Sequence, residues 1–362
     1  MLKFLIAMLV LAASAPMFAD TGTTFGDLMY MPNSSEFLFD NKSYSANGKY
    51  SIDRANGSGT ATDVYKNERK IGKMNQKLSY SISDYLLVGA GLGFAFQDRN
   101  FNDQKRGPNG ETRTKEPMVK NSASLTDPSI YARYRLMNTK DHGFVLDLTA
   151  GALVNLNPTR FNRAKRGAVT DQNNSTIGNQ QRGGAQYNIG AEVGKNFGVF
   201  EASASAEYLL GMKARTQRQA VDRFATSNTD PESKSPGYGN VDYNQDSTND
   251  FAFGVKTLTH LYTRWKFGLG ADVYYHDKTV NGGVFANGDR YIEETDSYVS
   301  TTFNTEIRFV YTRDLYISGG YLYGMNSDYD KKISKNGVVQ TQDKYKDDNL
   351  IHGGTIQFVA KF

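Results

Sequence analysis

The chain has 362 residues, and its 42 basic and 38 acidic side chains nearly balance, which gives no argument for nucleic-acid binding. It contains no cysteine, which excludes disulfide bridges, thiolate metal sites and lipid anchoring at a cysteine. Hydrophobic residues make up 39% and aromatic residues 12%, with only 8 prolines. This composition favours long β-strands with aromatic bands over helices or a disordered chain.

The first residues have the pattern of a secretory signal peptide. Lys3 supplies a positive start, and an apolar run follows over 4–13. This run is too short for a transmembrane helix, which needs about 20 apolar residues. Small residues after the run favour cleavage behind Ala19, so we expect a signal peptide over 1–19. Residues 20–33 are then expected to form a periplasmic N-terminal segment.

The rest of the chain repeats an apolar–polar alternation of period two, which predicts β-strands with two different faces. Over 144–157, one face is apolar at every position, while the other carries Asp147 and Thr149. Many of these segments exceed the usual strand length of about five to six residues and are long enough to cross a bilayer at a tilt. The pattern predicts about twelve strands, over 34–50, 71–82, 86–98, 122–136, 143–157, 184–194, 199–211, 249–261, 265–277, 297–311, 315–324 and 349–362.

Short turns and long polar loops alternate between these strands. This alternation is typical of an up-and-down antiparallel barrel in an outer membrane, with periplasmic turns and external loops. A soluble secreted barrel or sandwich, with its apolar face buried, is the alternative. The charged second face suits a watery lumen and favours the membrane barrel. We therefore predict an all-β transmembrane barrel of about twelve strands over 34–362. An even number of strands places both chain termini on the periplasmic side.

Two segments resemble known families. The last strand alternates apolar residues and ends with Ile356, Phe358 and Phe362, as do the last strands of Gram-negative outer-membrane β-barrels. Phe358 and Phe362 are therefore expected to form the membrane-insertion signature. The segment 125–136 reads LTDPSIYARYRL and resembles a strand opening in the phenol-degradation-type outer-membrane channels.

These resemblances imply a place in the cell outer membrane after export, in contact with lipid and lipopolysaccharide. They also imply insertion with the help of periplasmic chaperones and the barrel-assembly machinery. The second resemblance implies uptake of small molecules, aromatic ones among them. The oligomeric state is left open.

Charges on the second face define the candidate pore lining. The expected register places Arg133 opposite Asp147, a cross-strand ion pair, and Glu192 opposite Glu201. Two like charges destabilise a sheet unless a cation lies between them. Either Arg133 and Arg135 reach this acidic pair and form a lumen network, which we favour, or the pair faces water and gives a weak cation preference. The predicted pore-lining residues are Arg133, Arg135, Asp147, Glu192, Glu201, Lys256, Asp272, Glu306 and Arg308.

The histidines give no support for an enzyme or a metal site. His260 and His276 share the lumen side, but His260 is expected opposite Lys266, far from His276. No two of the four histidines converge, and the common hydrolase motifs are absent. We therefore predict no enzyme, no metal and no cofactor.

The aromatic residues near strand ends are interpreted as interfacial girdles of a membrane barrel. The alternatives are the core of a soluble protein and a carbohydrate-binding platform. The residues concerned are Tyr80, Tyr85, Trp265, Tyr275, Tyr298, Tyr311, Tyr321 and Tyr323.

The external loops leave two questions open. Segments 99–120 and 160–166 are rich in Arg and Lys, which suits either contact with lipopolysaccharide phosphates or a merely solvated loop. The segment 212–248 contains a spacing from Asp242 onwards like the start of a calcium loop. It lacks the glycine and glutamate of that motif, so calcium binding stays open.

A barrel of about twelve strands is wider than the eight-stranded barrels that side chains fill and narrower than sixteen-stranded porins. We therefore predict a porin-like channel that lets small solutes diffuse passively. The alternatives are a closed structural or adhesive barrel that acts through its external loops and, behind it, a surface hydrolase.

Overall fold

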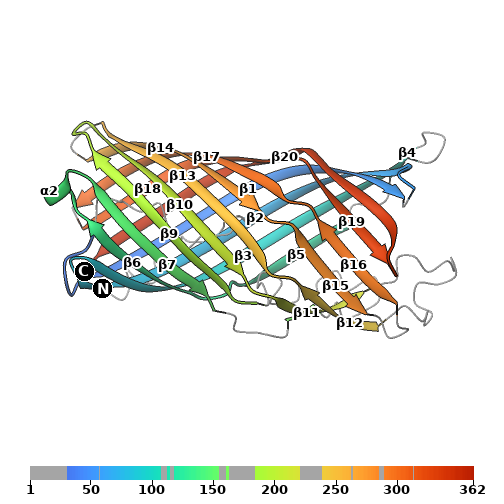
Figure 1. Cartoon of the computed structure of the whole chain (residues 1–362). Coiled ribbons are helices and arrows are strands. Elements are labelled where there is room, and N and C mark those ends of the chain that lie inside the picture. Colours follow the sequence, from blue (N-terminus) through green and yellow to red (C-terminus); the bar gives the residue numbers. More distant parts are fainter. Residues whose placement is uncertain are drawn as a thin grey trace.

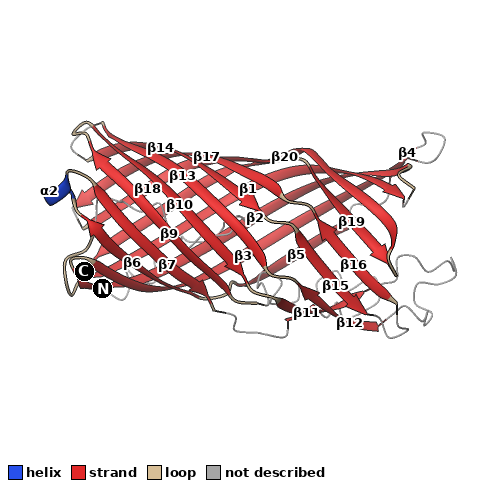
Figure 2. Cartoon of the chain, in the orientation of Figure 1, coloured by secondary structure: helices blue, strands red, loops and turns tan. Residues whose placement is uncertain are grey.

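The computed structural model describes residues 31–56, 58–106, 112–114, 118–154, 160–162, 184–220, 239–261, 264–284, 289–312 and 314–362. Most of these residues lie in strands that hydrogen-bond into one sheet (Figure 1, Figure 2). The expected signal peptide, 1–19, and all but three residues of the segment 20–33 lie outside the described residues. No helix in the described part of the chain is long and apolar enough to cross a membrane.

Within the described ranges, twelve antiparallel strands close the barrel, and the last of them pairs with the first. This confirms the predicted all-β antiparallel barrel. The barrel strands are β1 (Phe37–Asn56), β2 (Ala61–Ser83), β3 (Leu86–Arg106), β6 (Ser129–Met137), β7 (Val145–Leu153), β9 (Gln186–Asn196), β10 (Phe200–Gly211), β13 (Thr248–His260), β14 (Trp265–His276), β17 (Tyr298–Thr312), β18 (Leu315–Asn326) and β20 (Val338–Lys361).

The short connections between strands, the start of β1 and the end of β20 all lie on one side of the membrane belt. We call this side of the barrel the turn end. Phe37 at the start of β1 and the C-terminal Phe362 exchange backbone hydrogen bonds of 2.7 and 3.0 Å there. A single helical turn, α2 (Thr139–His142), joins β6 to β7 at the same end (Figure 1). Gly143 ends α2 with φ of 75°, a left-handed conformation that favours glycine.

The opposite end, here called the loop end, differs from the expected long loops. Much of 278–296 and 325–348 is strand, in the hairpin of β15 (Thr279–Val284) with β16 (Arg290–Thr295) and in the pairing of β19 (Tyr329–Lys335) with β20. The sequence prediction depended on an apolar face, which these segments lack. Cross-strand pairs between polar residues still stabilise a sheet, so the strands continue beyond the apolar belt.

Further short strands extend the same sheet at the loop end. Most of the residues from 51 to 70, expected as a loop, belong to β1 and β2. The other extensions are β4 (Thr112–Thr114), β8 (Arg160–Asn162), β11 (Ala214–Ala220) and β12 (Gly239–Gln245).

The strand expected over 122–136 is interrupted. Residues 126–128 separate β5 (Met118–Leu125) from β6, and both strands pair with β3. Pro128 cannot donate a backbone hydrogen bond, which explains why the ladder breaks at this point. Thr126 N still donates to Gly93 O at 2.8 Å and holds the connection against β3.

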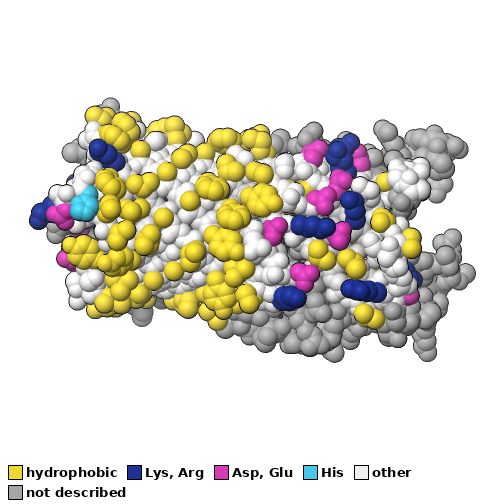
Figure 3. Space-filling model, viewed as in Figure 1, with side chains coloured by type: hydrophobic (Ala, Val, Ile, Leu, Met, Phe, Trp, Pro, Cys, Tyr) yellow, Lys and Arg dark blue, Asp and Glu magenta, His cyan; other side chains and the backbone are white. Residues whose placement is uncertain are grey.

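The two faces of the barrel are inverted relative to a soluble protein. In β7, Leu148 is 43% exposed while its neighbour Asp147 is fully buried, and in β17 Ile307 is 53% exposed while Arg308 is fully buried. Figure 3 shows hydrophobic side chains over the half of the barrel at the turn end, and charged side chains mainly over the loop end. The apolar belt therefore faces outward, as lipid requires, and the charged side faces the lumen.

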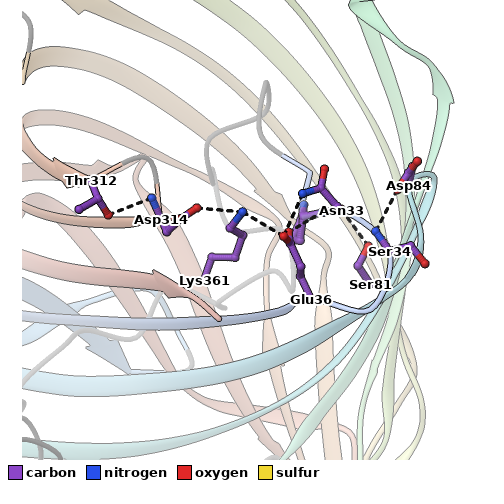
Figure 4. A network of polar contacts seen from close by, with 9 residues as sticks. Asn33, Ser34, Glu36, Ser81, Asp84, Thr312, Asp314 and Lys361 are labelled. Carbon is purple, nitrogen blue, oxygen red and sulfur yellow. Dashed lines mark hydrogen bonds and ion pairs between the residues drawn. The ribbon is translucent and has the colours of Figure 1, made fainter.

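A polar network secures the seam where β1 meets β20 at the turn end (Figure 4). Lys361 Nζ contacts Glu36 Oε1 at 3.2 Å and Asp314 Oδ1 at 2.8 Å. Asn33 donates to Glu36 from its backbone at 2.7 Å and from its side chain at 2.9 Å. The hydrogen bonds from Asn33, together with Lys361, hold the pKa of Glu36 below its usual value. The seam is thus tied to the preceding segment and to the β17–β18 turn.

Replacing Lys361 with alanine should weaken this seam. We expect a loss on the order of 0.5–1 kcal/mol from the Lys361–Asp314 pair, because ion pairs near the surface contribute little more. Urea unfolding of the barrel in lipid vesicles measures the loss. Lys213→Ala is the matched control, because Lys213 and Asp246 are largely exposed and lie 3.6 Å apart. Equal urea midpoints for the two variants would contradict a role of Lys361 in the seam.

Candidate functional site

The lumen contains a cluster of ion pairs at the level of the apolar belt. Asp147 in β7 accepts from both arginines of β6, from Arg135 Nε at 3.0 Å and from Arg133. Asp147 is fully buried, and Arg135 is 7% exposed. Arg135, and not Arg133 as expected, stands directly opposite Asp147. The α2 turn and a register shift after Arg135 move the pairing by two residues, and Arg133 reaches Asp147 diagonally.

The expected facing pair of Glu192 and Glu201 does not exist. Glu192 in β9 stands opposite Ser205 on one side and Asp147 on the other. Glu201 stands opposite Asn196, because the turn between β9 and β10 closes at these two residues. Glu201 accepts from Lys266 Nζ at 3.5 Å. The like-charged neighbours in the lumen are therefore Glu192 and Asp147, and the nearby arginines attract both.

A second group of charges lies on β13 and β17. Glu306 accepts from Lys256 Nζ at 2.8 Å and from Arg308 Nε at 2.7 Å. The Arg308 guanidinium also lies 4.1 Å from the centre of the Tyr316 ring, a cation–π contact. Arg308 is fully buried, so these contacts stabilise a charge that has no access to water.

All nine predicted pore-lining residues belong to barrel strands, and their alternation with the outer apolar residues places them on the lumen side. Asp272 is held there by Asn304 Nδ2 at 3.2 Å. Near-complete burial of several of them shows that their side chains cover one another, which indicates a narrow part of the lumen. We call this part the charged constriction, made of Arg133, Arg135, Asp147, Glu192, Lys256, Glu306 and Arg308.

The predicted set of pore-lining residues left out other buried polar residues that line the same interior. Asp40 accepts from Gln357 Nε2 at 2.9 Å, and Glu207 accepts from Asn188 Nδ2 at 2.5 Å. Lys77 is 5% exposed. The period-two pattern of their strands contains the signal, because each lies on the face opposite the apolar residues.

The space beside the lumen glycines is partly filled. At Gly89 an added Cβ would come within 2.6 Å of the Tyr131 ring. Tyr131 therefore lies across Gly89, and its hydroxyl group contacts Ser79. The Tyr131 side chain thus narrows the lumen beside the charged constriction.

Aromatic residues occupy both faces of the barrel. Trp265, Tyr311 and Tyr321 are 44%, 60% and 49% exposed on the outer face, as a girdle requires. Tyr298 does not belong to the girdle, because it shares the inward face of β17 with Arg308 and stacks on other rings. These stacked rings form a row that we call the aromatic ladder, made of Tyr274, His276, Tyr298, Tyr329, Tyr345 and Tyr50.

Several candidate binding residues that the sequence places at the loop end lie in segments that the structure describes only in part. The side chains of the basic segments 99–120 and 160–166 and of Asp242 lie outside the described residues. Asp246 pairs with Lys213 instead of a calcium-loop neighbour. Among the described residues, no three His, Asp or Glu side chains come together as a metal site would need. His260 stands opposite Lys266, which confirms that part of the predicted register.

A closed barrel with an apolar outer belt and a charged lumen defines an outer-membrane β-barrel protein. No protein-family model and no curated protein matches the chain. Solved structures with a similar arrangement are an outer membrane channel from Pseudomonas putida F1, a mutant of the TodX monoaromatic hydrocarbon channel, and the outer membrane protease OmpT from Escherichia coli.

These likenesses extend over nearly whole chains but are loose. The Pseudomonas putida channel is 13% identical with a TM-score of 0.49, covering 94% of this chain and 100% of that one. TodX is 10% identical with a TM-score of 0.45, covering 97% and 96%. OmpT is 9% identical with a TM-score of 0.35, covering 92% and 98%. All three TM-scores lie below 0.5, so the function is argued from the barrel's own residues.

Proposed function

We propose that the protein is an outer-membrane channel through which small solutes diffuse passively. The observation that supports this proposal most is the charged lining of the closed barrel, in which acidic and basic side chains form ion pairs at the charged constriction. A barrel that only needs to be closed is filled more favourably by apolar side chains, because burying charges costs more than burying apolar groups. Charged side chains of the constriction that keep some exposure, such as Lys256 and Glu306 at 11% and 13%, therefore favour a path for small polar solutes.

Passage needs no cofactor in this proposal. The constriction selects by size, and its alternating charges select weakly by sign. The turn end faces the periplasm, and the loop end faces the outside of the cell. Contact with lipid and lipopolysaccharide is made by the outer apolar belt and the strand extensions.

Planar-bilayer recording with the purified mature barrel tests the channel. We expect small stepwise conductance increases as single barrels insert. A bilayer that stays silent although insertion is verified by protease protection would contradict the channel and favour the closed structural barrel. Heat-denatured protein in the same detergent is the control.

Glu201 offers a test of charge at the turn end of the lumen. Glu201→Lys places a second cation beside Lys266, so we expect a shift of ion selectivity toward anions. The reversal potential in a KCl gradient measures it. The control is Glu294→Lys, because Glu294 pairs with Lys278 at the more exposed loop end. If Glu201→Lys leaves the ion selectivity unchanged, the ion pairs of the charged constriction, and not the charge at position 201, determine that selectivity.

We also propose that residues 1–19 direct export and are then removed, and that 20–33 remain on the periplasmic side. Insertion in the cell uses periplasmic chaperones and the barrel-assembly machinery in this proposal. N-terminal sequencing of protein purified from the outer membrane should begin at Asp20. An intact Met1 in that fraction would contradict the cleavage.

A further inference from the structure

The aromatic ladder crosses five strands on the inner wall of the barrel, toward the loop end. It runs from β14 through β17, β19 and β20 to β1. The ring centroids of Tyr298 and Tyr329 lie 4.5 Å apart, as do those of Tyr329 and Tyr345. The planes of the last two rings differ by only 7°. Such a continuous row is more than the isolated cross-strand pair that stabilises a sheet.

The ladder lies on the extracellular side of the constriction. In β17, Tyr298 precedes Arg308 by ten residues on the same inward face, which is roughly 33 Å along the strand. A solute that enters from the loop end therefore meets the ladder before the charged constriction. The ladder and the constriction are two separate parts of the lumen.

The stacking determines what the ladder offers to a solute. From His276 to Tyr345 neighbouring rings cover much of each other's faces, so a solute meets mainly ring edges and phenolic hydroxyl groups on the partly exposed side chains. A phenolic hydroxyl group both donates and accepts hydrogen bonds.

The surroundings of the ladder are polar and balanced in charge. Arg54 donates to both carboxylate oxygens of Asp343 at 2.6 Å, and Lys331 Nζ lies 2.8 Å from Glu293. An apolar solute would remove water from these groups without replacing its hydrogen bonds. A charged solute would find each of these four charges already matched by a partner.

We propose that the aromatic ladder binds neutral, hydroxyl-rich solutes, of which saccharides are the natural class. Sugar hydroxyl groups would exchange hydrogen bonds with the tyrosine hydroxyl groups, and these bonds would carry the recognition because the stacked ring faces are covered. A flat aromatic solute would instead have to separate rings that already stack. This proposal rests on the proposed function, because the ladder would bind a solute on its way into the channel. The affinity must then be low enough for the solute to be released.

Saturation-transfer NMR on the mature barrel tests the binding directly. The detergent is lauryldimethylamine oxide, which has no sugar headgroup to compete. Glucose, sucrose and maltotriose are the probes, and phenol is the aromatic comparator. We expect at least one of the three saccharides to bind with a dissociation constant of about 1–10 mM.

Two substitutions at Tyr329 locate the site. Tyr329→Ala should weaken saccharide binding roughly fivefold or more, because it interrupts the ladder and removes a hydroxyl group. Tyr329→Phe keeps the stack and should weaken binding about twofold or more. Tyr321→Ala is the matched control, because Tyr321 lies on the lipid side of β18, and it should leave binding unchanged. The heat-modifiable gel shift confirms that each variant is folded.

Three results would overturn the proposal. One is no binding of any of the three saccharides up to about 100 mM. Another is unchanged saccharide binding in folded Tyr329→Phe, because the hydroxyl group would then play no part. The third is phenol binding that depends on Tyr329 in a protein that binds no saccharide. Binding in detergent does not require passage, so saccharide binding with a silent bilayer would refute the channel alone, and conductance without saccharide binding would refute the ladder site alone.

Discussion

Asp147→Ala is expected to destabilise the barrel by about 3–5 kcal/mol, because it leaves the buried Arg135 and the largely buried Arg133 without their shared carboxylate. Arg133 and Arg135 both contact Asp147, which has no solvent exposure. Urea unfolding of the barrel in lipid vesicles, followed by the heat-modifiable gel shift, measures the loss. Asp246→Ala is the matched control and should change stability by less than about 0.5 kcal/mol, because its partner Lys213 is 78% exposed.

Glu192 limits this effect and provides a second variant. It stands opposite Asp147, and its Oε1 atom is buried without a hydrogen-bond partner among the described residues. In Asp147→Ala the carboxylate of Glu192 can take over part of the contact with the arginines. The double variant Asp147→Ala, Glu192→Gln should therefore be less stable than Asp147→Ala alone. If both variants lose no more stability than Asp246→Ala, the ion pairs between Asp147 and the two arginines do not stabilise the barrel.

Glu306→Gln is expected to produce the largest change in ion selectivity. Glu306 is the carboxylate between Lys256 and Arg308, so its neutralisation removes one of the three carboxylates that face the four cations of the charged constriction and increases its net positive charge. A change of about 1 kcal/mol in the difference between the anion and cation energies at the constriction alters the anion-to-cation permeability ratio roughly fivefold. The reversal potential in a KCl gradient measures this ratio in a planar bilayer.

Glu294→Gln is the control for the selectivity measurement. Glu294 is 37% exposed beside Lys278 at the loop end, where salt screens its charge. We expect its reversal potential to match that of the unsubstituted barrel. A Glu306→Gln barrel that conducts with unchanged selectivity would place the solute path away from Glu306.

The membrane-crossing strands could be predicted because each has one apolar face. In β10 and β14, small and aromatic apolar residues alternate with polar ones, and this period is a property of the sequence itself. β19 could not be found in this way, because neither face of Tyr329 to Lys335 is continuously apolar. Its pairing depends on neighbours such as Glu293 opposite Ile333, which only the closed sheet brings together.

The lumen residues were predicted as a set but not in their pairs. Parity along each strand assigns Arg133, Asp147 and Glu306 to the lumen, whereas the pairing depends on turn geometry. The turn with α2 shifted Arg133 by two residues from its expected partner, and the β9–β10 turn separated Glu192 from Glu201. The aromatic ladder was missed because its central members, Tyr329 and Tyr345, come from a segment expected to be a loop, and only the closed sheet places them between Tyr298 and Tyr50.

The orientation of the strands underlies both the fold and the channel, since the apolar face of each strand contacts lipid and the polar face contacts the lumen. The absence of cysteine in the chain permits single-cysteine labelling, and β10 offers three adjacent small residues, Ala204, Ser205 and Ala206. A bimane label on Ala204→Cys or Ala206→Cys should be quenched by brominated lipid, and a label on Ser205→Cys by aqueous iodide. The reverse pattern, with lipid quenching only at position 205, would contradict this orientation.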